Sequence, residues 1–208
     1  MYIYADSTSF LTLGILDNDF KWKEFTVISE RKVGTQIHAH IYHLLNKHNL
    51  DLVDIDGFIF IAGPGSYTGM RVTEGMAQIL EWQGLPVFSF YHYDVPKILE
   101  EDKGTWITMA FRGEWFIHEW DNDNERQSIL PIDQADSVIR SASQPVFTSY
   151  QHTVQDLFEK NILTSIKETN EMIFTGAEKI FPAIVNNRIR KHLFYFRTPE
   201  QEFKTSAG

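Results

Sequence analysis

A short apolar run at the start of the chain, residues 1–4, precedes two segments, 11–15 and 20–28, in which hydrophobic and polar residues alternate. The turn-forming cluster Asp17-Asn18-Asp19 separates the two alternating segments. A period of two is the pattern of a strand with one buried face. The sequence therefore predicts three consecutive antiparallel strands at its start.

Further along, the hydrophobic pattern switches between a helical period and short continuous apolar runs. Residues Ile37, Ile41, Leu44 and Leu45 follow the three-and-four spacing of a helix, which is expected over about 35–49. The run 58–62 is apolar throughout, as in a strand buried on both faces. A second helix (70–83), a second buried strand (87–90) and a short helix near 95–99 are predicted to follow.

A similar order of elements returns after the segment 100–104. The patterns predict a hairpin of strands 106–110 and 115–120, a third strand at 127–130, a helix at 133–141, a strand at 146–149, a helix at 152–165, and a last helix at 176–191 with a kink at Pro182. Three antiparallel strands followed by alternating helices and strands imply a mixed sheet with helices on its faces. We therefore expect an α/β protein of two tandem actin-like (ASKHA or RNase H-like) halves, 1–103 and 104–208.

Composition narrows the functional classes. The 208 residues carry a net charge of −9, and an acidic body is a poor nonspecific binder of nucleic acid. The absence of cysteine excludes disulfides, thiolate metal sites and cysteine nucleophiles. The N-terminus lacks the cationic start of a signal peptide, and no apolar run has the length of a membrane helix. We expect a cytoplasmic protein without a membrane segment.

A glycine-rich string between the strand at 58–62 and the next helix is the most informative segment. It comprises Gly63, Pro64, Gly65, Ser66, Tyr67, Thr68, Gly69, Met70, Arg71 and Val72. Met70 replaces the lysine of a Walker A loop, Thr68 stands where a dinucleotide fingerprint needs glycine, and Pro64 excludes a nucleophile elbow. Spacing alone leaves two interpretations open: a structural turn, or backbone N–H groups that meet an anion.

The whole string closely resembles the signature Gly-Pro-Gly-Ser-Phe-Thr-Gly-Leu-Arg-Ile of the TsaB (YeaZ) family. These bacterial proteins are needed to make threonylcarbamoyladenosine in tRNA. Four further pieces resemble the family in order: Ala5-Asp6-Ser7-Thr8, residues 50–57, Ala110 with Gly113-Glu114, and Tyr195-Phe196-Arg197. The resemblance is firm over residues 1–99 and thin beyond.

Two departures from the family pattern indicate a divergent copy. Val33-Gly34-Thr35 stands where the family often has His-Ser-Glu, and Met109 and Phe111 stand where it has Asp and Arg in the second hairpin. These changes put in doubt any role of those side chains, and they suggest a partner surface of this chain's own.

The resemblance implies a subunit without catalytic residues that orders a complex. Its catalytic partner would be TsaD, a TsaE-like ATPase would join the assembly, and contact with tRNA would be indirect. In the family, the first-half helices pack against TsaD or form a homodimer. The resemblance therefore implies a partner surface on helices 35–49 and 70–83. The candidates for this surface are Ile37, Ile41, Leu45, Met76 and Ile79. The alternative is that all five residues belong to the core. No cofactor is expected, except a nucleotide at a joint interface with partners.

Asp6, Ser7 and Thr8 are the candidates for a vestigial phosphate loop. Asp6 either caps the turn that follows it, which we prefer, or is a catalytic carboxylate. The second hairpin offers neither an aspartate nor a glycine-threonine pair, so half of a phosphoryl-transfer clamp is missing. This supports a chain that is not an enzyme. A small phosphate- or nucleotide-dependent enzyme of the actin-like fold remains the alternative.

Histidine spacing argues against a metal site. TsaD-type relatives carry His-x-x-x-His after the second buried strand, but here His92 is followed by Pro96, which cannot be a ligand. In the cluster His38, His40 and His43, only the last two share a helical face, and no acidic residue follows in the next turn. We therefore predict no metal site, and a solvated or interface face for this cluster.

Two further expectations concern the C-terminal cations and the glycine string. Arg188, Arg190, Lys191 and His192 either contact tRNA or a partner, or lie at the C-terminus of the last helix, which we prefer. The substitution Gly69→Val is expected to break the turn or the packing of the second helix, because a β-branched residue tolerates positive φ badly.

Overall fold

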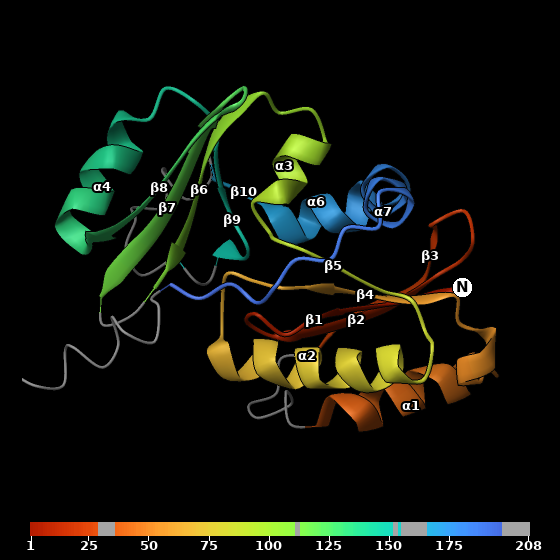
Figure 1. The fold of residues 1–208 in the computed structure, drawn as a ribbon. Helices are drawn as coiled ribbons and strands as arrows, with labels where there is room; N and C mark the ends of the chain where they lie inside the picture. Colours follow the sequence, from red (N-terminus) through yellow and green to blue (C-terminus); the bar gives the residue numbers. More distant parts are fainter. Residues whose placement is uncertain (29–35, 111–112, 152–153, 155–165, 197–208) are drawn as a thin grey trace, which may run out of the picture.

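The computed structural model describes residues 1–28, 36–110, 113–151, 154 and 166–196, and Figure 1 shows the arrangement of its elements. The first half contains β1 (Tyr2–Asp6), β2 (Leu11–Leu16), β3 (Trp22–Ile28), α1 (Ile37–Lys47), the 3-10 turn η2 (Leu52–Asp54), β4 (Gly57–Ile61), α2 (Tyr67–Trp82), β5 (Val87–Phe90) and α3 (Asp94–Ile98). The rest contains β6 (Lys103–Met109), β7 (Glu114–Asp121), β8 (Asn124–Pro131), α4 (Ile132–Ser141), β9 (Val146–Thr148), β10 (Ile166–Glu168), α6 (Thr169–Thr175) and α7 (Ala177–Asn186).

Both sheets have the same topology. The first has the order β3-β2-β1-β4-β5, and the second has the order β10-β9-β6-β7-β8. Read from its other edge, the second sheet repeats the order of the first, strand for strand. In each sheet the first three strands are antiparallel neighbours, and the later strands are parallel to the first of them. The predicted repeat of mixed sheets is confirmed.

The first sheet is buried on both faces. Helices α1 and α2 cover one face, where Ile41 and Leu45 pack with Phe58 and Phe60. Helix α7 covers the other face, where Phe181 packs against Tyr4 and the neighbouring aromatic residues. Because helices cover both faces, β4 is apolar throughout, as the sequence pattern predicts.

The second sheet is packed differently on its two faces. Helix α4 covers one face, where it packs against Trp115 and Ile117 of β7. The other face carries Trp106, Phe116 and Trp120, and Tyr93, which precedes α3, packs against it with Phe194 and Phe196. Figure 1 shows α3, α6 and α7 between the two sheets. The two halves therefore share buried surface along these helices.

The largest difference from the sequence-based expectation lies near the C-terminus. The last helix, α7, ends at Asn186, not at residue 191. Beyond it the chain runs beside β5, where Ser89 N donates to the Ile189 carbonyl at 3.0 Å and Lys191 N donates to the Ser89 carbonyl at 3.1 Å. The unpaired edge of β5 gives these residues backbone partners outside a helix, which is why the helical pattern ends early. The short elements β10 and α6 were not predicted, and the helix predicted at 152–165 lies outside the described residues, apart from Val154.

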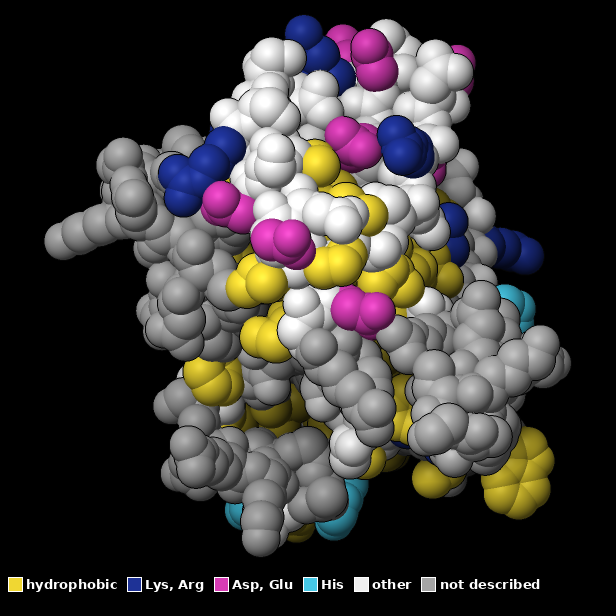
Figure 2. Space-filling model, turned by 90° about the vertical axis from the view of Figure 1, so that its left-hand side faces the viewer, with side chains coloured by type: hydrophobic (Ala, Val, Ile, Leu, Met, Phe, Trp, Pro, Cys, Tyr) yellow, Lys and Arg dark blue, Asp and Glu magenta, His cyan; other side chains and the backbone are white. Residues whose placement is uncertain are grey.

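The described surface carries exposed apolar side chains among acidic ones (Figure 2). Within the described residues, no helix is both long and apolar enough to cross a lipid bilayer. Figure 2 shows hydrophobic side chains across the middle of the face on the left of Figure 1, with acidic side chains among them. Ile132, at the start of α4, is 44% exposed. It is an exposed apolar residue outside α1 and α2.

Candidate functional site

The glycine string forms the turn from β4 into α2, and two of its backbone N–H groups, those of Ser66 and Gly69, have partners near the start of α2. The Ser66 hydroxyl accepts a hydrogen bond from Gly69 N–H at 3.3 Å and so caps α2. Ser66 N–H donates to the Thr8 carbonyl at 2.6 Å. Gly63 has φ of 122°, a conformation that favours glycine. Two of the groups that an anion would need are therefore engaged, which favours a structural turn.

The turn after β1 packs directly on this string. A Cβ atom at Gly65 would lie 2.4 Å from the Thr8 Cβ, and one at Gly69 would lie 2.0 Å from the Ser7 carbonyl oxygen. Gly69 lies in the first turn of α2 and is not one of the positive-φ glycines. The reason expected for its sensitivity, a positive φ, is therefore wrong. Close backbone approach is what requires glycine there.

The remaining residues of the string point in different directions. Pro64 is buried, while Thr68 and Arg71 are exposed. The Arg71 guanidinium lies 4.1 Å from the centre of the Tyr67 ring, and the Tyr195 ring lies 5.3 Å from Tyr67. Arg71 thus stacks on an aromatic side chain at the surface.

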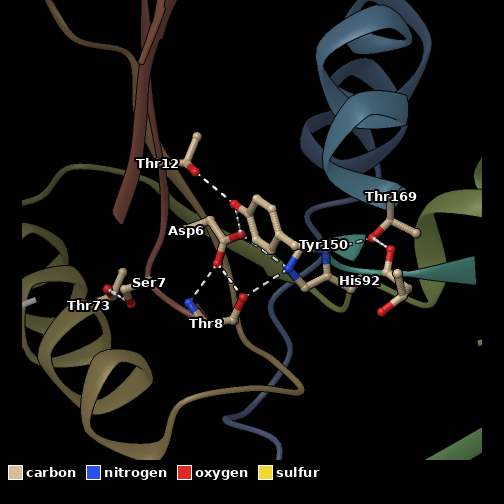
Figure 3. A network of polar contacts seen from close by, with 9 residues as sticks. Asp6, Ser7, Thr8, Thr12, Thr73, His92, Tyr150 and Thr169 are labelled. Atoms are coloured by element: carbon tan, nitrogen blue, oxygen red, sulfur yellow. Dashed lines mark hydrogen bonds and ion pairs between the residues drawn. The ribbon is translucent and has the colours of Figure 1, made fainter. Parts of the chain in front are cut away.

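The vestigial-loop candidates belong to a buried polar network (Figure 3). Asp6 Oδ1 accepts hydrogen bonds from Thr8 N–H at 2.8 Å and from the Thr8 hydroxyl at 2.7 Å. Asp6 Oδ2 accepts one from Tyr150 at 3.2 Å and lies 3.1 Å from His92 Nε2. Ser7 bonds to Thr73 of α2, hydroxyl to hydroxyl, at 2.5 Å. The Thr8 bonds have the geometry of an Asx turn, so the preferred interpretation of Asp6 as a cap is supported, and His92 and Tyr150 are further partners.

The same network reaches the second half through His92. Its Nδ1 lies 3.0 Å from the Thr169 hydroxyl at the start of α6, and that hydroxyl also contacts the Thr148 carbonyl at 3.1 Å. Thr12 of β2 bonds to the Tyr150 hydroxyl at 2.8 Å. Asp6 and His92 each stand out in the sequence, but as separate residues. Thr12, Tyr150 and Thr169 carry no local signal, because they reach the network only through the fold.

Burial and charge set the electrostatics of this network. Burial by itself would raise the pKa of Asp6, but the charge and hydrogen bond of His92 and the two Thr8 bonds hold it below its usual value. The pKa of Tyr150 is raised well above its usual value by burial and by the Asp6 charge. Asp6 is therefore a fully enclosed acceptor that these hydrogen bonds hold in its ionised form.

The described histidines lie in separate surroundings. Among the described residues, no three histidine, aspartate or glutamate side chains gather in a way that could hold a metal ion. His38 and His43 are exposed and His40 is half-buried on α1. His92 has a carboxylate and threonine hydroxyls as neighbours.

The partner-surface candidates divide between core and surface. Ile37, Ile41 and Leu45 are at most 6% exposed and belong to the core, so the structure places these three away from any partner. Met76 is partly buried against the same core, and Ile79 is 54% exposed. The cause is the orientation of α1, whose apolar stripe faces the first sheet.

Exposed aromatic residues on the same helices escaped the sequence analysis. Trp82 of α2 is 90% exposed and Tyr42 of α1 is 63% exposed. Gly75, Ile79 and Trp82 are spaced by four and three along α2, opposite the buried Ala77 and Leu80. These exposed residues could have been predicted from the second apolar stripe of α2, which lies outside its core-facing stripe. We call Tyr42, Ile79 and Trp82 the helical apolar face.

The C-terminal cations do not lie in the last turn of a helix, as preferred, because α7 ends before them. The Arg190 guanidinium forms an ion pair with Glu74 of α2 at 2.8 Å and also contacts the Ser89 hydroxyl. It therefore ties the C-terminal segment to α2. The segment continues to Phe194, whose N–H donates to the Ala62 carbonyl at 2.9 Å.

The departures from the family pattern fall mostly outside the described residues, as Val33, Gly34, Thr35 and Phe111 do. Met109, at the end of β6, is 51% exposed. It offers no group that could grip a phosphate or a metal ion. Arg197 of the C-terminal family piece is also outside the described residues.

A second buried histidine gives a testable pH dependence. His118 of β7 stacks on Tyr93 at 4.3 Å, and burial lowers its pKa to about 4 from 6.5 despite the nearby Glu125. As pH falls through 6.5, the unfolded chain binds the proton first, so stability is lost. Between pH 7.5 and 5 the free energy of unfolding should fall by about 2 kcal/mol from this group. Urea unfolding of wild type and His118→Phe at both pH values measures this loss of stability. The control His43→Gln should lose as much stability between the two pH values as wild type does.

The repeated strand order and the polar junction between the halves define the class of protein: this is an actin-like fold of two tandem halves. No protein-family model matches the chain. It is similar to the tRNA threonylcarbamoyladenosine biosynthesis protein TsaB of Bacillus subtilis (strain 168), with 32% identity over 84 residues. That match covers 39% of this chain and 37% of the relative, so the match spans little more than a third of that protein's length.

Two solved structures share the fold over nearly the whole chain. YeaZ from Pseudomonas aeruginosa has a TM-score of 0.54 and 13% identity, covering 92% of this chain and 99% of that one. A protein described as similar to peptidase YeaZ from Pseudomonas aeruginosa has a TM-score of 0.54 and 15% identity, covering 93% and 99%. The predicted resemblance to the TsaB (YeaZ) family is confirmed by the sequence match, and the fold is the same.

Proposed function

We propose that this chain acts in the synthesis of threonylcarbamoyladenosine in tRNA, as a non-catalytic subunit that binds a TsaD-like catalytic subunit. The similarity to TsaB and the YeaZ fold support the pathway. The adenosine next to the anticodon would be modified by the partner, in the cytoplasm. A TsaE-like ATPase would join the same assembly.

The observation that carries the partner role is the helical apolar face. A tryptophan that is 90% exposed, with Ile79 one turn away at 54%, is unusual on a helix whose other face is fully packed. Large exposed apolar patches mark interaction sites, and tryptophan is a frequent hot-spot residue. We therefore place the partner contact on the outer side of α2 and the adjacent part of α1. A second copy of this chain would occupy the same face when the partner is absent.

The buried carboxylate supports the absence of catalysis. Asp6 is completely enclosed, and its oxygens are held by Thr8, Tyr150 and His92. A phosphoryl-transfer site needs accessible acidic groups that hold metal and phosphate. The net charge of −9 favours tRNA contact through partners rather than through this chain. A nucleotide in the assembly would then lie at the joint interface. Calorimetry on the isolated chain should show no tight ATP binding; ATP turnover that Asp6→Ala abolishes would establish the enzyme alternative.

Co-purification with TsaD of the same organism tests the proposal. The expected result is a stable complex, and tRNA modification that depends on adding this chain. TsaD that is fully active alone, with no complex formed, would refute the proposed role. Reconstitution with purified tRNA and the modified nucleoside as readout separates binding from activity.

Substitution of Trp82 tests the location of the contact. Trp82→Ala should weaken TsaD binding by about thirtyfold or more, because a hot-spot tryptophan contributes about 2 kcal/mol or more. Its exposure means that the melting temperature should hardly change. Ile132→Ala, also exposed but on α4, is the matched control and should bind as wild type. Equal affinities for wild type and Trp82→Ala would place the contact elsewhere.

A further inference from the structure

A fully buried histidine, His92, lies at the junction between the two halves. We propose that His92 is the central residue of a latch that fixes the orientation of the two halves without any ligand. The latch consists of Asp6, Thr8, His92, Tyr150 and Thr169. This inference does not depend on the proposed function.

Each side of the His92 ring contacts a different half. Nε2 faces Asp6, the last residue of β1, at 3.1 Å and the Thr8 hydroxyl, in the turn that follows, at 3.0 Å. Nδ1 faces the Thr169 hydroxyl at 3.0 Å, where β10 of the second sheet passes into α6. The Asp6, His92 and Thr169 side chains are all fully buried. Figure 3 shows the ring between the end of β1 and the start of α6.

Hydrogen counting supports an ionic bridge. The Thr8 hydroxyl donates to Asp6 Oδ1, so toward His92 it can only accept, and Nε2 must carry a proton. The Thr169 hydroxyl has one proton and faces both the Thr148 carbonyl at 3.1 Å and Nδ1 at 3.0 Å; when it donates to the carbonyl, Nδ1 donates to it. In that arrangement both ring nitrogens carry a proton, and a positive ring faces an enclosed carboxylate. Buried charges persist in proteins when they are paired in this way.

A second bond crosses the junction in parallel with the histidine. Tyr150 follows β9 of the second sheet, and its hydroxyl donates to Asp6 Oδ2 at 3.2 Å while bonding to Thr12 of β2 at 2.8 Å. The His92 ring also lies nearly parallel to Trp106 of β6, with centres 6.3 Å apart. The first half thus presents one carboxylate that both a histidine and a tyrosine engage. Loss of the ring removes the bridge and leaves a space lined by Asp6, Thr8 and Thr169.

Distance measurements between the halves test the latch. The chain has no cysteine, so Gln78→Cys on α2 and Ser137→Cys on α4 give a uniquely spin-labelled pair at exposed positions. Otherwise wild-type protein should show one narrow distance distribution, unchanged by ATP with magnesium. His92→Ala should broaden it or add a second distance. The same narrow distribution in His92→Ala would overturn the proposal.

Imidazole provides a rescue that a general loss of stability would not show. Added imidazole should enter the space left in His92→Ala and return the distribution toward that of the otherwise wild-type pair. The matched control is Ile117→Ala, which removes another fully buried side chain, inside the core of the second half. It should lower the melting temperature but keep the narrow distribution, with no response to imidazole. Equal broadening in both variants would contradict the latch.

A milder variant covers the case in which His92→Ala does not fold. Tyr150→Phe combined with Thr169→Val keeps every ring in place and removes two hydroxyl groups that bind across the junction. Its distance distribution should broaden, and amide exchange at residues 7–10 and 148–151 should rise together. A narrow distribution in this variant would refute the latch.

Discussion

Asp6→Asn is expected to lower the free energy of unfolding by about 3–5 kcal/mol, the loss found when one partner of a buried ion pair is removed. The carboxylate is fully buried and accepts from two Thr8 groups, Tyr150 and His92. An amide has one acceptor oxygen instead of two, and it carries no charge to pair with His92. Urea unfolding at pH 7 measures the change.

The acid limb of the stability curve gives an independent readout of the same residue. The pKa of Asp6 in the folded chain lies below its usual value of 3.8. Its contribution is therefore present above pH 3.8 and is lost as pH falls further, because the unfolded chain binds the proton first. Asp6→Asn should lack this part of the acid dependence.

Asp123→Asn is the matched control for Asp6→Asn. Asp123 is an exposed aspartate in the turn between β7 and β8. Its replacement should change stability by less than about 0.5 kcal/mol. A similarly small effect for Asp6→Asn would mean that Asp6 is not a charged member of the network.

The elements of the first half could be predicted because their periodicity is set by burial. The apolar run 87–90 coincides with β5, and the stripe from Ile37 to Leu45 lies in α1. Both patterns arise from faces that must be buried against the sheet. The repeated element order then followed from local patterns alone, without any similarity of letters between the halves.

Non-local contacts explain what the sequence could not predict. The sequence pattern predicts that the last helix continues to residue 191. The open edge of β5, a hundred positions earlier, instead gives the backbone of this segment its hydrogen-bond partners. Elements β10 and α6 are short, so their periods are too brief to read.

In the candidate site, too, single residues could be predicted from the sequence but their contacts could not. Asp6 and His92 stood out as isolated residue types, but their contact spans 86 positions of the chain, and no local pattern records it. The exposure of Trp82 depends on which side of α2 faces the sheet. The spacing of Trp82 from Ile79 indicates a second apolar stripe on α2. The core-facing stripe alone, however, is enough to predict the helix, so the second stripe was not recognised.

Gly69→Val is expected to be the most damaging substitution in the glycine string, costing about 3 kcal/mol or more. The first added carbon would lie 2.0 Å from the Ser7 carbonyl oxygen, far inside van der Waals contact, and the obstacle is backbone rather than a movable side chain. Overpacking a rigid site forces α2 away from the turn after β1, which also carries Thr8 of the latch. Thermal and urea unfolding measure the loss.

Gly75→Ala is the matched control, because it adds a side chain to the same helix at a position with no atom within 4 Å. Alanine is a better helix former than glycine, so this variant should be more stable than wild type by about 0.5–1 kcal/mol. Opposite signs at the two positions would show that close packing, and not glycine's flexibility, is what Gly69 provides. A Gly69→Val protein that melts like wild type and still binds TsaD would show that residues 7–8 can move away from α2 without loss.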